Sequence, residues 1–149
     1  MELRIGHSHH GDAMRLMGLD VGDKRIGVAL SDPDKTLARS LRVVRRRSQE
    51  ADMALMATLV EEHEVERIII GHPLHLNGRA GEQAARIESY AAKLRIALGI
   101  PVVLWDESYS TQMAREAMIE AGRTRKERKE RLDAVAAAVI LQDYMDHER

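Results

Sequence analysis

Four acidic residues from three distant segments are the side chains of this sequence best suited to chemistry. Asp20 ends an apolar run, Asp106 and Glu107 follow another, and Asp133 precedes an alanine-rich segment. Carboxylates gathered at one point raise one another's pKa unless a cation neutralises them. Mg²⁺ or Mn²⁺ accepts oxygen ligands and leaves room for phosphate oxygens and water. Such a site best serves phosphodiester cleavage, in which the cation activates water and neutralises the leaving oxygen.

Asp20 taken alone has a second interpretation. Asp is a common turn residue because its short side chain bonds nearby backbone amides. A carboxylate at a rigid strand end nevertheless holds a cation better than one on a loose loop, and Gly22 leaves backbone space for a phosphate. The partners that Asp20 meets in the fold must decide between the two interpretations.

The first half of the chain predicts an antiparallel meander followed by a helix. Alternating apolar residues indicate strands over Arg15–Val21, Arg25–Ser31 and Leu37–Arg45, and the connections between them are short. Ser48 is a good N-cap for a helix that runs to about Glu64.

The second half predicts a βαβ unit and two further helices. A buried strand over Arg67–Gly71 is followed by a helix with Ile87, Ala91, Leu94 and Leu98 on one face, and then by a strand over Pro101–Trp105. A helix should begin at Ser110 or Thr111 and stop at Gly122, and the last helix spans about Arg131–His147.

The expected fold is α/β, with the order βββαβαβαα and a mixed five-stranded sheet that carries helices on both faces. Ligands of such folds gather at the carboxyl ends of the strands. Asp20 and the pair Asp106-Glu107 lie at such ends. Small alanines let the last helix approach the sheet closely, which would bring Asp133, at its start, to the same place.

Composition is consistent with one intracellular domain. The chain has 149 residues, 44% of them apolar, which suffices for one core, and it has no cysteine that could form a disulfide or a thiolate zinc site. We see no leader segment and no apolar stretch long enough to span a membrane, so a cytoplasmic location is expected. Residues 1–13 lack periodicity and are interpreted as a flexible extension to a single domain at 14–149.

Several residues are candidates for contact with a nucleic acid. The net charge is only −1, but Arg42 and Arg45–Arg47 form one basic run and Arg123–Arg131 a second that contains Arg125 and Lys126. Such runs bind phosphate or form a solvated face. Lys24 and Arg25 have the same two interpretations, as phosphate contacts or surface charges of a hairpin. Asn77 and Gly78 form a tight loop that either touches a phosphate or acts as a turn alone.

Four segments together resemble the YqgF/RuvX family. They are GLDVGDKRIGVALSD at Gly18–Asp32, GHPL at Gly71–Leu74 with Asn77-Gly78, DESYST at Asp106–Thr111, and DAVAA at Asp133–Ala137. The resemblance covers about Met14 to Tyr144, and the combination and order of the segments make it specific.

The resemblance implies an RNase H-like fold related to the Holliday-junction resolvase RuvC, and a nuclease that matures the 5′ end of pre-16S ribosomal RNA. It also implies that Asp20, Glu107 and Asp133 form an acidic metal-binding triad. The family usually has arginine after the Asp-Glu pair, where this chain has Ser108. Asp106 is expected to orient the turn or to support the metal ligands, because neighbours on an extended chain face opposite ways.

Two other functions compete with an RNA nuclease. One is a structure-selective DNA nuclease acting on branched junctions, which should be a two-fold dimer because it cuts two strands symmetrically. The other is a non-catalytic nucleic-acid-binding or regulatory protein, although clustered carboxylates would then repel the ligand. The sequence is compatible with a monomer or a homodimer.

Overall fold

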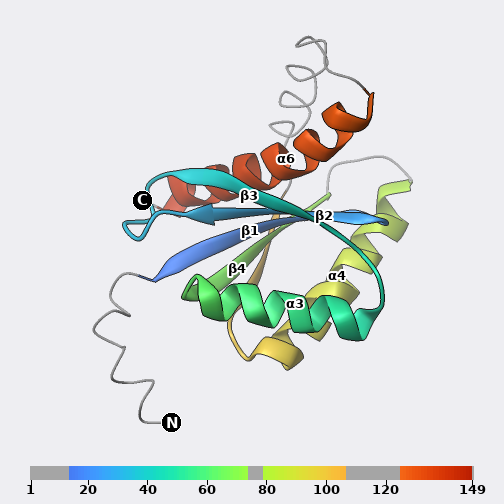
Figure 1. Ribbon diagram of the computed structural model, residues 1–149, viewed down its shortest axis with the longest axis horizontal. Helices are drawn as coiled ribbons and strands as arrows, with labels where there is room; N and C mark the ends of the chain where they lie inside the picture. The colour runs from blue at the N-terminus through green and yellow to red at the C-terminus, as the bar shows by residue number, and fades with distance from the viewer. Residues whose placement is uncertain (1–13, 74–78, 107–124, 149) are drawn as a thin grey trace.

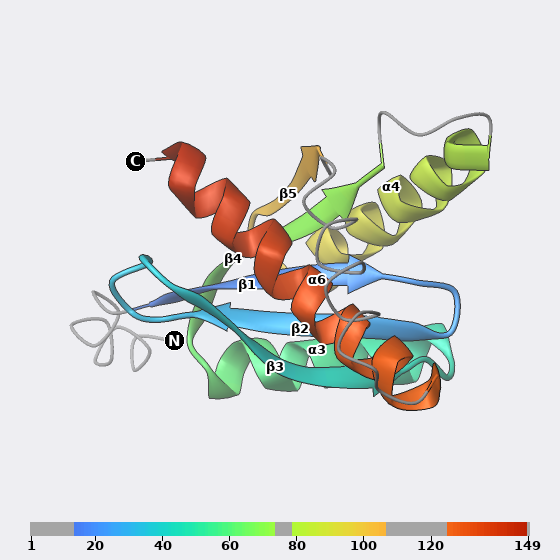
Figure 2. The same ribbon diagram turned by 90° about the horizontal axis from the view of Figure 1, so that it is seen from above.

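The computed structural model describes residues 14–73, 79–106 and 125–148, with backbone alone at 79–80 and 125–132. Its elements, in chain order, are β1 (Arg15–Val21), β2 (Arg25–Ser31), β3 (Ala38–Arg45), α3 (Gln49–Glu62), β4 (Val65–His72), α4 (Arg79–Leu98), β5 (Val102–Asp106) and α6 (Arg125–Glu148). Figure 1 labels these elements apart from β5, which is labelled in Figure 2. The predicted extension at 1–13 and the predicted helix from Ser110 to Gly122 lie outside these residues.

The strands form one mixed sheet in the order β3-β2-β1-β4-β5. β1 pairs antiparallel with β2, and β2 antiparallel with β3, as the predicted meander requires. β4 runs parallel to both β1 and β5, which confirms the βαβ unit. The mixed five-stranded sheet is therefore as predicted.

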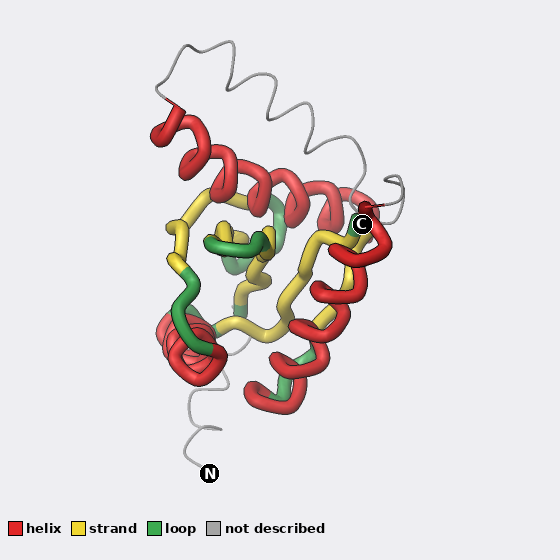
Figure 3. The backbone as a smooth tube through the Cα atoms, turned by 90° about the vertical axis from the view of Figure 1, so that its right-hand side faces the viewer, coloured by secondary structure: helices red, strands yellow, loops and turns green. Residues whose placement is uncertain are grey.

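Helices cover both faces of the sheet. Figures 1 and 3 show α3 and α4 on one face and α6 on the other. In the view of Figure 2, α6 crosses the strands obliquely, and it contacts β1, β2 and β3. Among the described residues, no helix is both long enough and apolar enough to cross a membrane.

Each face of the sheet has its own apolar core. Residues of β1 alternate between the two: Met17, Leu19 and Val21 belong to the cluster shared with α3 and α4, whereas Leu16 belongs to the cluster shared with α6. This alternation follows from the two-residue period of a strand. Odd-numbered positions of β1 therefore face α3 and α4, and even-numbered positions, including Asp20, face α6.

Local chemistry explains the limits of α3. The Ser48 hydroxyl accepts a hydrogen bond from the Ala51 amide at 3.1 Å, which confirms the predicted N-cap. The helix ends at Glu62 rather than at Glu64, because Glu64 adopts a left-handed backbone conformation with φ of 52°.

The predicted start of the last helix was wrong. α6 begins at Arg125 rather than at Arg131, so Asp133 lies about two turns inside the helix and not at its start. Arginine, lysine and glutamate fill residues 125–131 and are good helix formers. Apolar periodicity, on which the prediction relied, is absent from this part of the helix.

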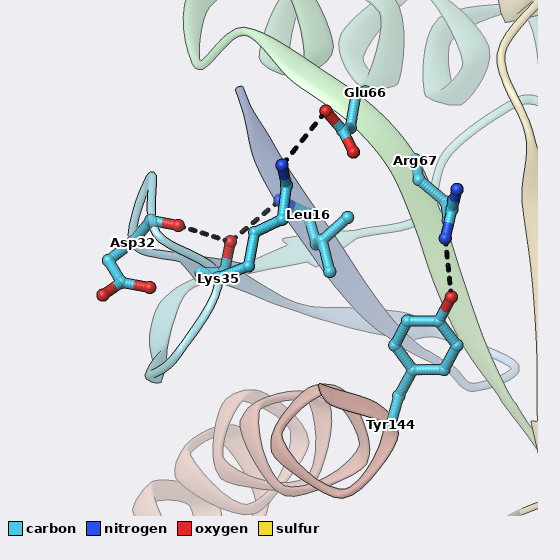
Figure 4. A network of polar contacts seen from close by, with 7 residues as sticks. Leu16, Asp32, Lys35, Glu66, Arg67 and Tyr144 are labelled. Carbon is cyan, nitrogen blue, oxygen red and sulfur yellow. Dashed lines mark hydrogen bonds and ion pairs between the residues drawn. The ribbon is translucent and has the colours of Figure 1, made fainter. Parts of the chain in front are cut away.

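A polar network holds the end of the sheet that lies opposite the carboxyl end of β1 (Figure 4). Arg67 donates from Nη1 to the Tyr144 hydroxyl at 2.8 Å, which ties β4 to α6. Lys35 in the β2–β3 turn approaches Glu66 of β4, with Nζ and Oε1 3.3 Å apart. The C-terminal half of α6 and the turn after β2 are therefore anchored at this end.

Candidate active site

Several of the predicted site residues that the structure describes lie at one edge of the sheet. Because β1, β4 and β5 are parallel, their carboxyl ends lie at the same edge, and the antiparallel β2 begins there. Asp20 is the penultimate residue of β1, Arg25 is the first residue of β2, and Asp106 is the last residue of β5. This is the edge at which the sequence predicted ligand binding.

Gly27 is the point at which α6 meets this edge. It lies directly opposite Asp20 in the β1–β2 ladder. The α6 backbone is so close that a β-carbon on Gly27 would overlap the carbonyl group of Asp133 and would lie 3.0 Å from the Ala134 nitrogen. Only glycine permits this approach, and the approach brings Asp133 over the residue that pairs with Asp20.

Asp20 and Asp133 consequently lie on the same side of the sheet. Directly opposed residues of an antiparallel pair present their side chains on one face, with β-carbons about 4.5–5.5 Å apart. The face that Gly27 presents is covered by α6, so Asp20 also faces α6. It is half-buried, as is Asp133. Two of the three predicted carboxylates therefore lie on the same face and at the same edge of the sheet, although they are far apart in the sequence.

Arg25 provides a positive charge between the strands and α6. Its Nε donates to Oδ2 of Asp133 at 2.8 Å, and the side chains are only 15% and 23% exposed. Partial burial makes this ion pair stronger than a surface pair. The sequence left Arg25 as a phosphate contact or a surface charge of the hairpin, and in the structure its side chain is mostly buried and pairs with Asp133.

Asp106 points to the other face of the sheet. Its neighbour in the β4–β5 ladder is His72, and Nε2 of His72 lies 2.8 Å from Oε2 of Glu88 in α4. Asp106 shares the α4 face with His72, whereas Asp20 and Asp133 lie on the α6 face. The expected role of Asp106, to orient the turn or to support the metal ligands, stays a prediction.

Some of the remaining predicted residues lie within the described ranges and others lie outside them. The Gly22 amide donates to the Arg25 carbonyl at 2.9 Å and closes the β1–β2 turn, in which Lys24 is exposed. Arg125 and Lys126 form the start of α6, where the structure describes backbone alone. Glu107, Asn77 and Gly78 lie outside the described residues, as does Ser108.

The donor chemistry fits a hard divalent cation. Asp20 and Asp133 offer carboxylate oxygens, the ligands that Mg²⁺ and Mn²⁺ prefer. Within residues 14–73, 79–106 and 125–148, no group of three metal-ligating side chains comes together. The third predicted ligand, Glu107, is the next residue after β5 in the sequence and lies outside these ranges.

Sequence reasoning missed the part that Gly27 and Arg25 play in placing Asp133. A glycine inside a strand pattern is a known signal of close backbone approach, and Gly27 lies in the apolar run that predicts β2. That signal could have identified the contact point, but not its partner. The Arg25–Asp133 pair joins residues 108 positions apart, which no local pattern indicates.

Solved structures support the fold. The chain resembles T. thermophilus RuvC in complex with a Holliday junction substrate, with a TM-score of 0.58 over 91% of this chain and 95% of that one, at 15% identity. It also resembles the fowlpox virus Holliday junction resolvase, with a TM-score of 0.52 over 90% and 99% of the two chains, at 12% identity. The sheet, its helices and these likenesses define an RNase H-like α/β fold.

Comparison of sequences then gives the family. The model of the RuvX family, described as Holliday junction resolvase, matches residues 14–147. A relative from Desulforamulus reducens is 46% identical over 133 residues, which are 89% of this chain and 97% of that protein. One from Myxococcus xanthus is 44% identical over 136 residues, 91% and 90% of the two chains. Both carry the provisional name of pre-16S rRNA nuclease. The chain belongs to the RuvX family.

Proposed function

We propose that this protein is a divalent-metal-dependent nuclease that hydrolyses phosphodiester bonds in precursor 16S ribosomal RNA, with maturation of the 5′ end as its task. The observation that carries the proposal is the contact of α6 with Gly27, which brings Asp133 to the face and edge that bear Asp20. Paired carboxylates at the carboxyl end of a strand suit metal-assisted attack on a phosphodiester. The names of the close relatives support the RNA substrate.

The residues of the site have distinct roles in this proposal. Asp20 and Asp133 hold the cation, either Mg²⁺ or Mn²⁺, and Glu107 completes the set from the end of β5. When bound, the cation supplies Lewis-acid activation of water and neutralises charge on the phosphate. Arg25 restrains the Asp133 carboxylate, which it contacts at 2.8 Å. Lys24, exposed in the neighbouring turn, contacts a substrate phosphate.

A second candidate is the cleavage of branched DNA. It is favoured by the description of the matching family as Holliday junction resolvase. Symmetric cleavage of a junction requires two active sites related by a two-fold axis. This candidate therefore predicts a homodimer in solution, whereas cleavage of one RNA strand does not require a dimer.

The decisive experiment compares substrates, metals and one matched pair of variants. Labelled precursor 16S rRNA, single-stranded DNA and a four-way DNA junction are each incubated with Mg²⁺, Mn²⁺ or EDTA. The enzymes are the wild type, Asp20→Asn, and Asp34→Asn as the control. Asp34 is an exposed residue of the β2–β3 turn, at the opposite end of β2 from Gly27. The control therefore removes one carboxylate without touching the site.

We expect metal-dependent cleavage of the precursor RNA by wild type and Asp34→Asn, and at least a 100-fold loss of rate in Asp20→Asn. Equal cleavage by all three enzymes would refute the role of Asp20. Cleavage of the junction alone would replace the RNA proposal with the second candidate. Failure to cut any substrate under all metal conditions would favour a non-catalytic binding protein.

A further inference from the structure

A basic pocket lies on the other face of the sheet from Asp133. It is bounded by the β1–β2 turn, the segment that joins β3 to α3, and α4, and its volume is about 700 Å³. Six cationic residues line it: Lys24, Arg45, Arg46, Arg47, Arg86 and Lys93. The acidic residues of its wall are Asp23 and Asp52. The chain as a whole has a net charge of −1, so positive charge is concentrated here.

Most of this positive charge is not neutralised by the described residues. Nε of Arg86 lies 3.7 Å from Oδ1 of Asp23, and Nε of Arg46 lies 3.8 Å from Oδ2 of Asp52. Three other cations, Lys24, Arg47 and Lys93, make no ion pair within the described part of the chain, whereas Arg45, opposite Arg25 in the β2–β3 ladder, directs its side chain to the α6 face. Like charges around a concave surface raise the local potential and attract anions. The pocket is therefore suited to an anionic ligand.

Arg46 is fixed in position at the wall of the pocket. Its Nη1 donates to the Gly22 carbonyl at 2.8 Å, and its guanidinium lies 5.2 Å from the centre of the Tyr90 ring. Tyr90 is only 5% exposed, and its hydroxyl has no hydrogen-bond partner among the described residues. Burial raises the pKa of Tyr90 to about 12, so the phenol is neutral and offers no counter-charge. A cation restrained in this way loses little side-chain entropy when an anion binds.

The pocket and the candidate active site share the β1–β2 hairpin. Arg25 contacts Asp133 on the α6 face, and the adjacent Lys24 lines the pocket on the α3 and α4 face. A strand of nucleic acid whose scissile phosphate lies near Asp20 can therefore pass around the turn and continue into the pocket. We propose that this pocket binds backbone phosphates of a single nucleic-acid strand that flanks the bond cleaved at the Asp20 edge, an inference that rests on the proposed function.

The size of the pocket favours a single strand over a duplex. Pockets of about 300–1,000 Å³ enclose ligands of small-molecule size, so this one accommodates a few groups of an extended strand and not a double helix. Tyr90 is an aromatic residue of its wall, but Arg46 covers the ring. Base stacking is therefore not the source of affinity, and phosphate contacts are.

The test measures binding without cleavage. A fluorescein-labelled single-stranded uridine octamer is titrated with protein in EDTA, and anisotropy gives the Kd at several salt concentrations. The variant is Arg47→Glu/Lys93→Glu, which changes two exposed side chains of the pocket and no candidate metal ligand. Single variant Arg39→Glu is the control for charge reversal. Arg39 is exposed near the opposite end of β3, about 20 Å from the pocket by strand length.

We expect the double variant to bind the octamer at least about tenfold more weakly near 100 mM salt. The slope of log Kd against log salt should fall by the amount that about one phosphate contact or more contributes. Arg39→Glu should change the Kd less than twofold. Equal binding by the double variant and wild type would overturn the proposal, as would an equal loss in Arg39→Glu. Two results would overturn the assignment to a single strand. One is tight binding of a blunt duplex, and the other is complete displacement of the octamer by uridine monophosphate at the same concentration as the octamer.

The outcome is separable from that of the proposed function. If the wild type cuts precursor RNA but the double variant binds and cuts normally, the pocket inference fails and the nuclease proposal stands. If no substrate is cut but octamer binding needs Arg47 and Lys93, the pocket inference stands and the nuclease proposal fails. Circular-dichroism melting of each variant checks that the fold is retained.

Discussion

Arg25 and Asp133 form a half-buried ion pair, with 2.8 Å between Nε and Oδ2, that ties the start of β2 to α6. The pair neutralises Asp133 beside a second carboxylate, Asp20. A cation bound at the proposed site would provide the same neutralisation, so Arg25 would compete with it for the Asp133 oxygens. Such competition would connect the stability of the metal-free protein to the affinity of the proposed site.

Substitution Arg25→Met should therefore destabilise the metal-free protein and increase the stabilisation by metal. Removing the partner of a charged group costs about 2 kcal/mol. We expect a lower melting temperature in EDTA and a larger rise on adding Mn²⁺ than in the wild type. Arg45→Met is the control, because Arg45 lies opposite Arg25 in the β2–β3 ladder and is exposed. An unchanged Mn²⁺ effect in Arg25→Met would argue against competition.

Substitution Gly27→Ala should separate α6 from the sheet. The added methyl group would meet the backbone of Asp133, which cannot change rotamer to avoid it. We expect a loss of about 3 kcal/mol in urea unfolding and loss of nuclease activity. Gly81→Ala is the matched control, since its β-carbon would meet nothing within 4 Å. That change should stabilise α4 by up to about 1 kcal/mol. Full activity in Gly27→Ala would show that the close approach is not needed.

Substitution Asp20→Asn should abolish stabilisation by metal without weakening the metal-free fold. At a metal concentration 100 times its Kd, binding contributes about 2.7 kcal/mol, or roughly 5–10 °C in melting temperature for a chain of this size. The wild type should show this rise with Mn²⁺ and the variant should not. In EDTA the variant should be at least as stable, because one of two neighbouring negative charges is gone. A clearly lower melting temperature in EDTA would contradict the carboxylate cluster.

Asp32 should give the protein an acid-sensitive contribution to stability. Its carboxylate accepts hydrogen bonds from the Thr36 hydroxyl and amide, both at 2.7 Å, and from the Leu37 amide at 3.1 Å. These bonds, the Thr36 hydroxyl foremost, lower the pKa of Asp32 from 3.8 to about 2. Because the folded-state value is the lower one, the contribution is present above about pH 4 and is lost as the pH falls towards 2.

The check is a comparison of melting temperatures at pH 7, 4 and 2.5. Asp32→Ala should melt below the wild type at pH 7, and the difference should shrink at pH 2.5. Asp34→Ala, an exposed change in the same turn, should show no such narrowing. If the difference in melting temperature between Asp32→Ala and the wild type were constant across this pH range, the contribution of these hydrogen bonds would not depend on ionisation of the Asp32 carboxyl group.

The strands and the edge of the sheet that bears the site were predictable from the sequence because their signals are local. Turn residues and apolar alternation predicted β1 and β2 with their observed limits, and the isoleucine run predicted β4. The parallel order of β1, β4 and β5 then places Asp20 and Asp106 at one edge without any knowledge of side-chain contacts.

What the sequence could not indicate depends on tertiary packing. Nothing local links Gly27 to Asp133 or Arg25 to its partner, because the segments meet only after α6 has crossed the sheet. The basic pocket likewise combines Lys24, Arg47 and Lys93 from separate elements. Charge runs in the sequence identified the arginines near Arg45 as candidates, but not the lysine of α4 that faces them.

The glycines under α6 have a further consequence. A β-carbon on Gly18 would lie 2.8 Å from the Ala137 carbonyl oxygen, so the helix rests on main chain at Gly18 as well as at Gly27. A peptide group has no rotamers, unlike a side chain. The distance between α6 and the sheet at these glycines therefore does not change when side chains fluctuate. The separation of Asp20 from Asp133 should therefore outlast a loosening of the apolar core: variants that enlarge cavities near Met56 or Leu94 would lose unfolding free energy long before they lose the alignment of the two carboxylates.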